Sequence, residues 1–375
     1  MVHKGFLVPG SFGNRQSRRR RNTTMNFASN SHDPNGPNTR PGTKSNRLLF
    51  KRKGLIAALL LLVALVVAAG FIPVGGNKAA YDEPLNNNTE VTAMNLSSFS
   101  TAPPGLSLNL LFIHHSCGGQ LMADVGPDKG QSCIYQTSTN GGSLRSLLQK
   151  EGYIVHEASY DSEVGGKTDI FDWPAKFKND MGKVLLCDQQ NTYFKDGTKN
   201  QIVVFKSCFP QNAFSGMGRE PGNPAGPDLT VANAKAAYAA LLPEFAKHPE
   251  VLFVAMTAPP LVGSLKPEPL WKFIARIILR RPLPPPSTSG HLARHFNNWL
   301  KAETGWLATY KHKNVVVFDY YDILTAQGKS NYAEFPSGGG NDSHPSTVGN
   351  TQAALAFVPF LNQAVRRAGL SPKAF

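Results

Sequence analysis

Five short apolar runs within residues 106–375 constrain the fold of this chain more than any other feature. They are rich in Val, Ile, Leu and Phe and nearly continuous, and they comprise residues 108–114, 153–158, 201–207, 251–257 and 314–320. Such runs are typical of strands that are buried on both faces of a parallel sheet. Several segments between and after them, among them 142–152, 230–248, 291–312 and 351–369, have the spacing or end signals of helices. This alternation predicts a three-layer α/β/α sandwich around a five-stranded parallel sheet.

A reactive stretch, His-His-Ser-Cys at 114–117, follows the first predicted strand. Doubly wound sheets place their ligands at this edge, the carboxyl ends of the strands. A second polar loop, 341–346, opens the last predicted helix and carries Asp342 and His344 two residues apart. Alternate residues of an extended segment point the same way, so the two side chains can meet. We therefore predict acyl transfer with Ser116 as nucleophile, His344 as general base and Asp342 as the residue that orients the imidazole.

Acyl transfer also needs hydrogen-bond donors for the charge that develops on the carbonyl oxygen. The candidate donors are the backbone N–H of Ser116, a backbone N–H of Gly165 or Gly166 after the second predicted strand, and the side-chain amide of Asn212 after the third. The alternative for each of these residues is a purely structural role in a turn or loop.

The neighbouring side chains permit other chemistry. We expect His114 and His115 to shape the turn, because a metal site would need further ligands that no motif supplies; no metal and no cofactor are predicted. A thiol beside two histidines is a competent nucleophile, but a disulfide or a buried thiol is the preferred interpretation of Cys117. An even number of cysteines allows three disulfide pairings, among which the sequence does not choose: Cys117, Cys133, Cys187 and Cys208.

The order of these residues along the chain resembles the SGNH (GDSL-like) hydrolase superfamily over roughly residues 106–368. The stretches that carry the resemblance are FIHHSCGGQL, GGKTDIFDWPAKF, IVVFKSCFPQN, LFVAMTAPPL, ARHFNNWL, NVVVFDYYDILT and DSHPSTVGN. The resemblance implies a flavodoxin-like sheet and hydrolysis of esters on acylated carbohydrate, lipid or similar substrates. The sequence departs from the family pattern in three places. His114 and His115 replace Gly-Asp before the serine, Asn341 stands where the family has its Asp, and KSCFPQN replaces the Gly-x-Asn-Asp block.

The N-terminal part has a different character. Residues 1–53 hold twelve Lys or Arg and one acid, so most of the formal net charge of +14 lies there. The charge is thus not on the folded part, and nucleic-acid binding is not expected. Residues 54–74 are uncharged and long enough to cross a bilayer. We predict a disordered cytoplasmic tail, a transmembrane signal anchor at 54–74, a flexible stalk at 75–105 and an extracytoplasmic hydrolase-like domain at 106–375. A cleaved signal peptide is the alternative.

Taken together, the residues favour a membrane-anchored serine esterase or deacylase that acts on carbohydrate, lipid or cell-envelope esters. One alternative is an acyltransferase that passes the acyl group to a sugar. Another is a catalytically degenerate module that binds glycans or assists envelope assembly. The basic amphipathic segment 269–286 is expected to lie on a membrane, to cover the site as a lid, or to pack on the edge of the sheet.

Overall fold

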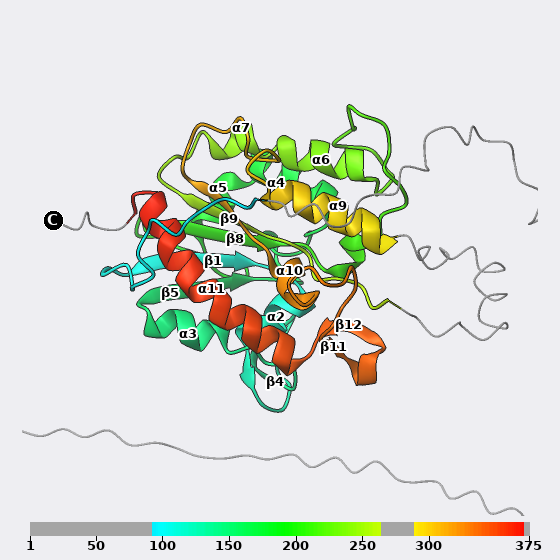
Figure 1. Cartoon of the computed structure of the whole chain (residues 1–375). Helices are drawn as coiled ribbons and strands as arrows, with labels where there is room; N and C mark the ends of the chain where they lie inside the picture. The colour runs from blue at the N-terminus through cyan, green and yellow to red at the C-terminus, as the bar shows by residue number, and fades with distance from the viewer. Residues whose placement is uncertain (1–91, 264–288, 371–375) are drawn as a thin grey trace, which may run out of the picture. The chain divides into compact units, whose positions relative to one another are not determined.

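The computed structural model describes residues 92–263 and 289–370 (Figure 1). The chain divides into units 1–83 and 84–375, and every described residue belongs to the second. The centre of this unit is a parallel sheet of five strands, as the apolar runs predict. Its strands are β1 (Leu108–Ile113), β5 (Tyr153–Ala158), β8 (Ile202–Lys206), β9 (Leu252–Met256) and β10 (Val315–Phe318).

The strand order places β1 in the interior of the sheet. The order is β5-β1-β8-β9-β10, in which the first strand along the chain lies between the second and the third. This is the flavodoxin-like, doubly wound arrangement, whose ligand site lies where the connections diverge from the first strand. Ile113, the last residue of β1, pairs with Ala158 on one side and Phe205 on the other. The chain therefore leaves β1 between the ends of two neighbouring strands.

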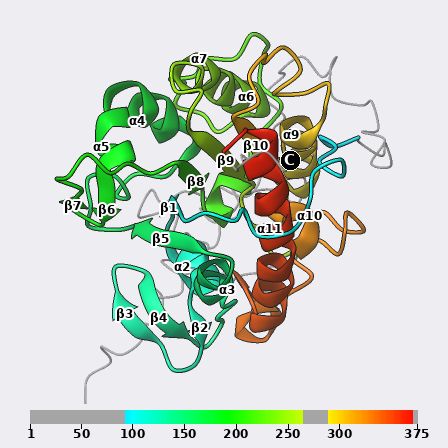
Figure 2. The same ribbon diagram turned by 90° about the vertical axis from the view of Figure 1, so that its left-hand side faces the viewer.

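Both faces of the sheet are covered, which explains why the strands are apolar without alternation. Leu110 and Phe112 belong to the core on one face, and Leu111 and Ile113 to the core on the other. One face packs against α2 (Ser116–Met122), α3 (Leu144–Lys150) and α11 (Thr347–Arg367). The opposite face packs against α4 (Trp173–Asn179), α5 (Met181–Leu186), α6 (Val231–Ala239), α7 (Leu242–Phe245) and α9 (Ser289–Lys301). Figures 1 and 2 show the two helical layers on either side of the sheet.

Identifiable side chains and glycines account for where several helices begin and end. The Thr230 side chain accepts a hydrogen bond from the backbone N–H of Asn233 and caps α6 at the start of the predicted segment 230–248. Gly152, with φ +92°, turns the chain after α3. The helix predicted at 291–312 ends earlier, at Lys301. The indole N–H of Trp306 donates to the carbonyl of Tyr238, and this buried contact draws the chain away from the helix axis.

The smaller elements surround the sheet. They are β2 (Asp124–Val125), β3 (Lys129–Gln131), β4 (Ile134–Ser138), β6 (Cys187–Gln189), β7 (Thr192–Tyr193), β11 (Pro336–Ser337), β12 (Asp342–Pro345), α10 (Tyr320–Leu324) and the 3-10 turns η1 (Ile170–Asp172), η2 (Phe209–Asn212) and η3 (Gly338–Gly340). The β2-β4-β3 sheet lies beside α2 and α3, apart from the main sheet (Figure 2).

Residues 92–105 lie on the domain, although the sequence placed them in the stalk. Leu96 is buried in the core beside α11, and the Gln363 side chain donates to the carbonyl of Phe99. Apolar side chains spaced irregularly in this segment give it no helix or strand pattern, so its packing was not predicted. Within the described ranges no helix has the length and apolar character needed to span a bilayer. The predicted anchor at 54–74 and the basic segment 269–286 both lie outside those ranges.

Candidate active site

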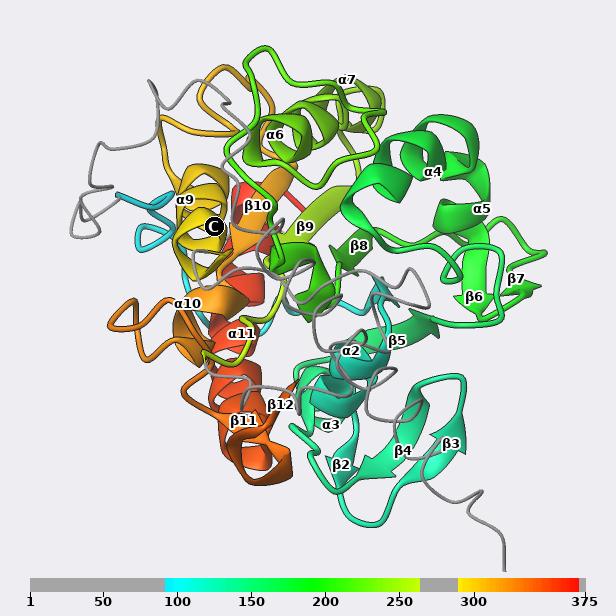
Figure 3. The same ribbon diagram turned by 90° about the vertical axis from the view of Figure 1, so that its right-hand side faces the viewer.

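Ser116 is the first residue of α2. This helix follows β1 at the carboxyl edge of the sheet (Figure 3). The preceding residue, His115, is the helix N-cap and has an extended backbone. Gly118 permits this sharp exit from β1, because a Cβ at this position would stand 2.3 Å from the Cβ of His114. The strand, the turn and the glycine together hold the Ser116 hydroxyl at the mouth of the sheet, and the side chain remains partly exposed.

The predicted partner loop reaches the same place from the far end of the chain. Asp342 and His344 belong to β12, which pairs with β11 and leads into α11. That helix begins at Thr347, four residues before the predicted segment 351–369. His344 Nε2 lies 2.9 Å from Ser116 Oγ, and His344 Nδ1 lies 2.7 Å from Asp342 Oδ1. The structure thus brings the three predicted residues into one hydrogen-bonded chain.

The hydrogen-bond acceptors determine which nitrogen of His344 carries the proton in this Ser116–His344–Asp342 chain of hydrogen bonds. The Asp342 carboxylate only accepts, so His344 Nδ1–H donates to it and leaves Nε2 free to accept from the Ser116 hydroxyl. Burial alone would raise the pKa of Asp342. The hydrogen bonds from the backbone N–H and ring of His344 outweigh burial and hold that pKa below its usual value. The carboxylate is therefore ionised at neutral pH and fixes the tautomer in which His344 can act as a base.

Three of the predicted oxyanion donors are engaged elsewhere. The Gly165 N–H donates to Ser162 Oγ and the Gly166 N–H to the Ser162 carbonyl, both at 2.8 Å. The Asn212 amide donates both hydrogens to backbone carbonyls, those of Ala258 and Pro259. These three residues hold loops in place in this conformation rather than presenting donors to Ser116. The remaining candidate is the backbone N–H of Ser116, in the first turn of α2, where N–H groups have no intrahelical acceptor.

His114 belongs to a buried charged network beneath the serine. Its Nδ1 lies 3.0 Å from the carbonyl of His115 and its Nε2 lies 3.0 Å from Glu157 Oε1. Both neighbours are hydrogen-bond acceptors, so each ring nitrogen of His114 faces an acceptor. Arg145 donates to the other carboxylate oxygen of Glu157. Although burial would raise the pKa of Glu157, the hydrogen bonds and charges of His114 and Arg145 lower it.

Sequence reasoning did not identify Glu157 or Arg145. The available signal was a glutamate inside the apolar run 153–158, because a charged residue in a strand buried on both faces needs a partner. His114 follows the neighbouring strand in register and supplies that partner.

His115 has a separate role. Its Nε2–H donates to the Gly165 carbonyl at 2.8 Å, and the Thr168 hydroxyl lies 3.0 Å from its Nδ1. Burial lowers the pKa of His115, which fits a neutral ring held by these two bonds. Tyr160, an exposed residue two positions after β5, stacks on this ring with centroids 3.7 Å apart and planes at 25°. The exposed phenol ring of Tyr160 and the His115 ring, which is adjacent to Ser116 in the sequence, thus form one stacked pair.

All four cysteines are free thiols, so no disulfide is formed among them. Cys208 lies next to the serine, with its Sγ 3.8 Å from Ser116 Oγ. Phe209 packs its ring edge-on against the His344 ring, at 5.0 Å between centroids. In the described residues, no group of three or more His, Cys, Asp or Glu side chains is arranged to hold a metal ion.

Comparisons with known proteins give distant structural likenesses only. No protein-family model matches the chain, and no curated protein sequence matches it. The solved structures that it resembles include the acetylxylan esterase Axe2 from Geobacillus stearothermophilus, at 16% identity and a TM-score of 0.34, over 71% of this chain and 96% of that one. The acetylxylan esterase Est2A from Butyrivibrio proteoclasticus is 13% identical with a TM-score of 0.33, over 69% of this chain and 64% of its own. The function proposed below rests on the geometry around Ser116.

Proposed function

We propose that this chain is a serine hydrolase that cleaves carboxylic esters. The observation that carries the proposal is the continuous hydrogen-bonded chain from Ser116 Oγ through His344 to Asp342, with distances of 2.9 and 2.7 Å. A nucleophile, a base within hydrogen-bond reach and a third group that orients the base form the constellation that covalent acyl transfer needs. A serine in an ordinary turn requires neither of the other two residues.

The proposed reaction has two halves. Ser116 Oγ attacks the acyl carbon while His344 Nε2 takes its proton, and the ionised Asp342 stabilises the resulting imidazolium. His344 then gives that proton to the departing alcohol, which leaves an acyl group on Ser116. A water molecule, deprotonated by His344, attacks this ester, and the acid is released as the serine recovers its proton. The backbone N–H of Ser116 is proposed to stabilise the charged oxygen.

We propose an ester-bearing carbohydrate or another cell-envelope ester as the substrate. Tyr160 supports a sugar, because an exposed aromatic face held rigid by His115 suits the apolar face of a pyranose ring. Acetylated xylo-oligosaccharides, the substrates named for an Axe2 variant among the similar solved structures, are the first substrates to try.

The test is hydrolysis of p-nitrophenyl acetate and of acetylated xylo-oligosaccharides by the wild-type chain and by Ser116→Ala and His344→Ala. Both variants should lose nearly all activity, whereas His312→Ala, which alters an exposed histidine, should retain it. A fluorophosphonate should label the wild-type chain at Ser116. If the folded wild-type chain neither hydrolyses these esters nor takes the label, the proposal is wrong and a binding module is favoured.

We also propose that residues 54–74 anchor the protein in a membrane, with the N-terminus cytoplasmic and the hydrolase domain outside. The uncharged apolar run and the preceding basic residues support this arrangement. Protease added to intact cells should digest the domain while it remains with the membrane fraction. A domain that is protected in intact cells, or found free of membranes, would contradict the anchor.

A further inference from the structure

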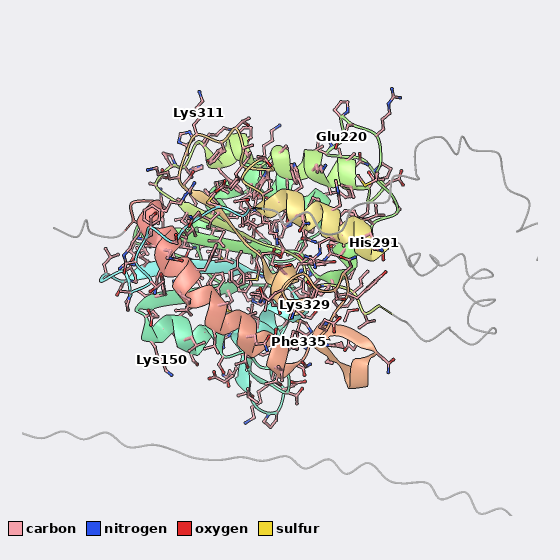
Figure 4. The ribbon with its side chains drawn as sticks, in the orientation of Figure 1. Lys150, Glu220, His291, Lys311, Lys329 and Phe335 are labelled. Atoms are coloured by element: carbon pink, nitrogen blue, oxygen red, sulfur yellow. The ribbon has the colours of Figure 1, made fainter. Side chains whose placement is uncertain are left out.

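Lys206 is a buried cation without a carboxylate partner. It is the last residue of β8, and none of its surface is exposed. No carboxylate of the described residues forms an ion pair with it; its ammonium donates to the Ser207 carbonyl at 3.2 Å and contacts Cys208 Sγ at 3.8 Å. Other lysines, such as Lys150 and Lys311, extend from the surface (Figure 4).

An ammonium buried without an anion is costly, by several kcal/mol even after relaxation. The cost is avoided if a nearby group becomes negative. The group in contact with Lys206 that can ionise is the thiol of Cys208, which is partly exposed at the mouth of the sheet. A thiolate here would give Lys206 the partner that no carboxylate supplies.

The surroundings of Cys208 Sγ fit a negative sulfur. The Lys206 ammonium lies 3.8 Å away, and the backbone N–H and the thiol of Cys117 are close enough to donate to it. The bond from the Cys117 thiol, with help from the Lys206 charge, outweighs burial and lowers the pKa of Cys208 well below its usual value. Donors and a cation thus converge on one sulfur atom.

The other three cysteines have the opposite environment. Cys117 and Cys187 have no exposed surface, and burial raises the pKa of each, to about 12 for Cys187. Cys133 is partly exposed like Cys208, but burial raises its pKa as well. Cys133 therefore serves as the control: a partly exposed thiol whose pKa is not lowered.

None of the other ionisable groups discussed below supplies a positive charge to Cys208 in place of Lys206. Tyr160 and Tyr320 have phenol pKa values raised by burial and stay neutral. Asp169 has a carboxyl pKa raised first by burial and then by Asp172, with a smaller contribution from the Cys208 charge. His115 is neutral, since burial lowers its pKa.

We propose that Cys208 is a thiolate paired with Lys206, and that it is a site of covalent modification by low-molecular-weight disulfides. The thiolate attacks one sulfur of the disulfide R–S–S–R, which forms Cys208–S–S–R and breaks the original S–S bond. The leaving R–S⁻ takes a proton from solvent, so the exchange needs no other reactant. Because Cys208 Sγ lies 3.8 Å from Ser116 Oγ, the attached group occupies space beside the serine.

The experiment follows the reaction of the full chain with 5,5′-dithiobis(2-nitrobenzoate) at about pH 6, with peptide mass spectrometry to assign each site. We expect Cys208 to react at least about tenfold faster than Cys133, because one pKa unit changes the thiolate fraction about tenfold below the pKa. Lys206→Met, which keeps the bulk and removes the charge, should slow the reaction of Cys208 about tenfold or more at this pH. Equal rates at Cys208 and Cys133, or an unchanged rate in Lys206→Met, would overturn the proposal.

A second measurement keeps the proposal testable if Lys206→Met does not fold. The ultraviolet absorbance of the thiolate is titrated in the wild-type chain and in Cys208→Ser. The wild-type chain should show a thiolate signal at neutral pH that Cys208→Ser lacks. Identical spectra of the two folded proteins at neutral pH would show a neutral thiol and sink the ion pair.

The modification and the ester hydrolysis are separable. Ser116→Ala should lose hydrolysis but still react at Cys208, so failure of one proposal does not decide the other. If the chain hydrolyses p-nitrophenyl acetate, formation of the mixed disulfide should remove that activity and dithiothreitol should restore it. Full modification of Cys208 with unchanged hydrolysis would contradict the placement of the attached group beside the serine.

Discussion

The carboxylate of Asp342 accepts two hydrogen bonds from one residue, His344. The imidazole Nδ1 donates at 2.7 Å and the backbone N–H at 3.0 Å, both to Oδ1. The short strand β12 thus sets the positions of both side chains in one local unit. Both hydrogen bonds form with Asp342 two residues before His344. Asn341, three residues before His344, is exposed.

The first prediction concerns this unit. Asp342→Asn should lower kcat for p-nitrophenyl acetate by about a hundredfold to ten-thousandfold with little change in KM, because the amide no longer fixes the tautomer of His344. Asn341→Ala is the control and should hydrolyse the ester at the wild-type rate. The assignment would fail if Asn341→Ala were the inactive variant and Asp342→Asn the active one.

The second prediction concerns the buried network beneath the serine. Glu157→Gln should lower the free energy of unfolding by roughly 3–5 kcal/mol at neutral pH, since His114 and Arg145 would lose their carboxylate. The measurement is urea denaturation. Glu163→Gln, which alters an exposed carboxylate paired with Lys183, should cost much less. Equal losses in the two variants would show that the buried network adds little.

The third prediction is the pH dependence of this network. The pKa of Glu157 is lower in the folded chain than in the unfolded one, so the unfolded state binds more protons in acid. The stabilisation is present above the unfolded pKa and is lost as the pH falls through the folded pKa. The wild-type free energy of unfolding should therefore fall more steeply on acidification than that of Glu157→Gln. Parallel profiles would rule out this coupling.

The fourth prediction concerns the aromatic surface of Tyr160. Tyr160→Ala should raise KM for an acetylated xylo-oligosaccharide several-fold and leave p-nitrophenyl acetate hydrolysis nearly unchanged, because only the sugar would contact the ring. Tyr160→Phe keeps the ring and should behave as wild type. Ile154→Ala, which removes an exposed apolar side chain of β5, is the surface control. A loss on both substrates would indicate a structural role for the ring instead.

The fifth prediction concerns Gly118. Gly118→Ala should destabilise the chain by about 1–3 kcal/mol and reduce hydrolysis, because the new methyl group would displace His114 from beneath the serine. Gly182→Ala in α5, where a Cβ meets nothing within 4 Å, should not destabilise the chain. Thermal melting of the two variants compares them, and equal melting temperatures would contradict the steric argument.

Apolar runs predicted the central sheet closely because burial on both faces leaves a continuous signal in the sequence. The two-residue spacing of Asp342 and His344 was equally readable, since it depends only on an extended local backbone. The oxyanion donors could not be predicted from the sequence in this way, because the direction of a backbone N–H depends on the conformation of the whole loop. The Gly165 loop turns both glycine N–H groups toward Ser162.

Contacts between side chains on neighbouring strands were also not predicted from the sequence. The pairing of Glu157 with His114 depends on the register of β1 against β5, and the isolation of Lys206 depends on the absence of carboxylates from its described surroundings. Both depend on which residues lie close together in the folded structure, and the order of residues along the sequence does not show this. The length of the packed domain was misjudged for a similar reason, since residues near Leu96 are held by α11 from the opposite end of the chain.

The hydrogen bond between Ser116 and His344 joins residues that are 228 positions apart. A ribosome that has synthesised the first strand, its serine and the whole central sheet has still produced no base for that serine. The proposed nucleophile therefore lacks its proposed base until β12, the strand that precedes α11, has been synthesised. A chain cut short by early termination or by proteolysis before β12 would thus carry all five strands of the central sheet without the proposed base.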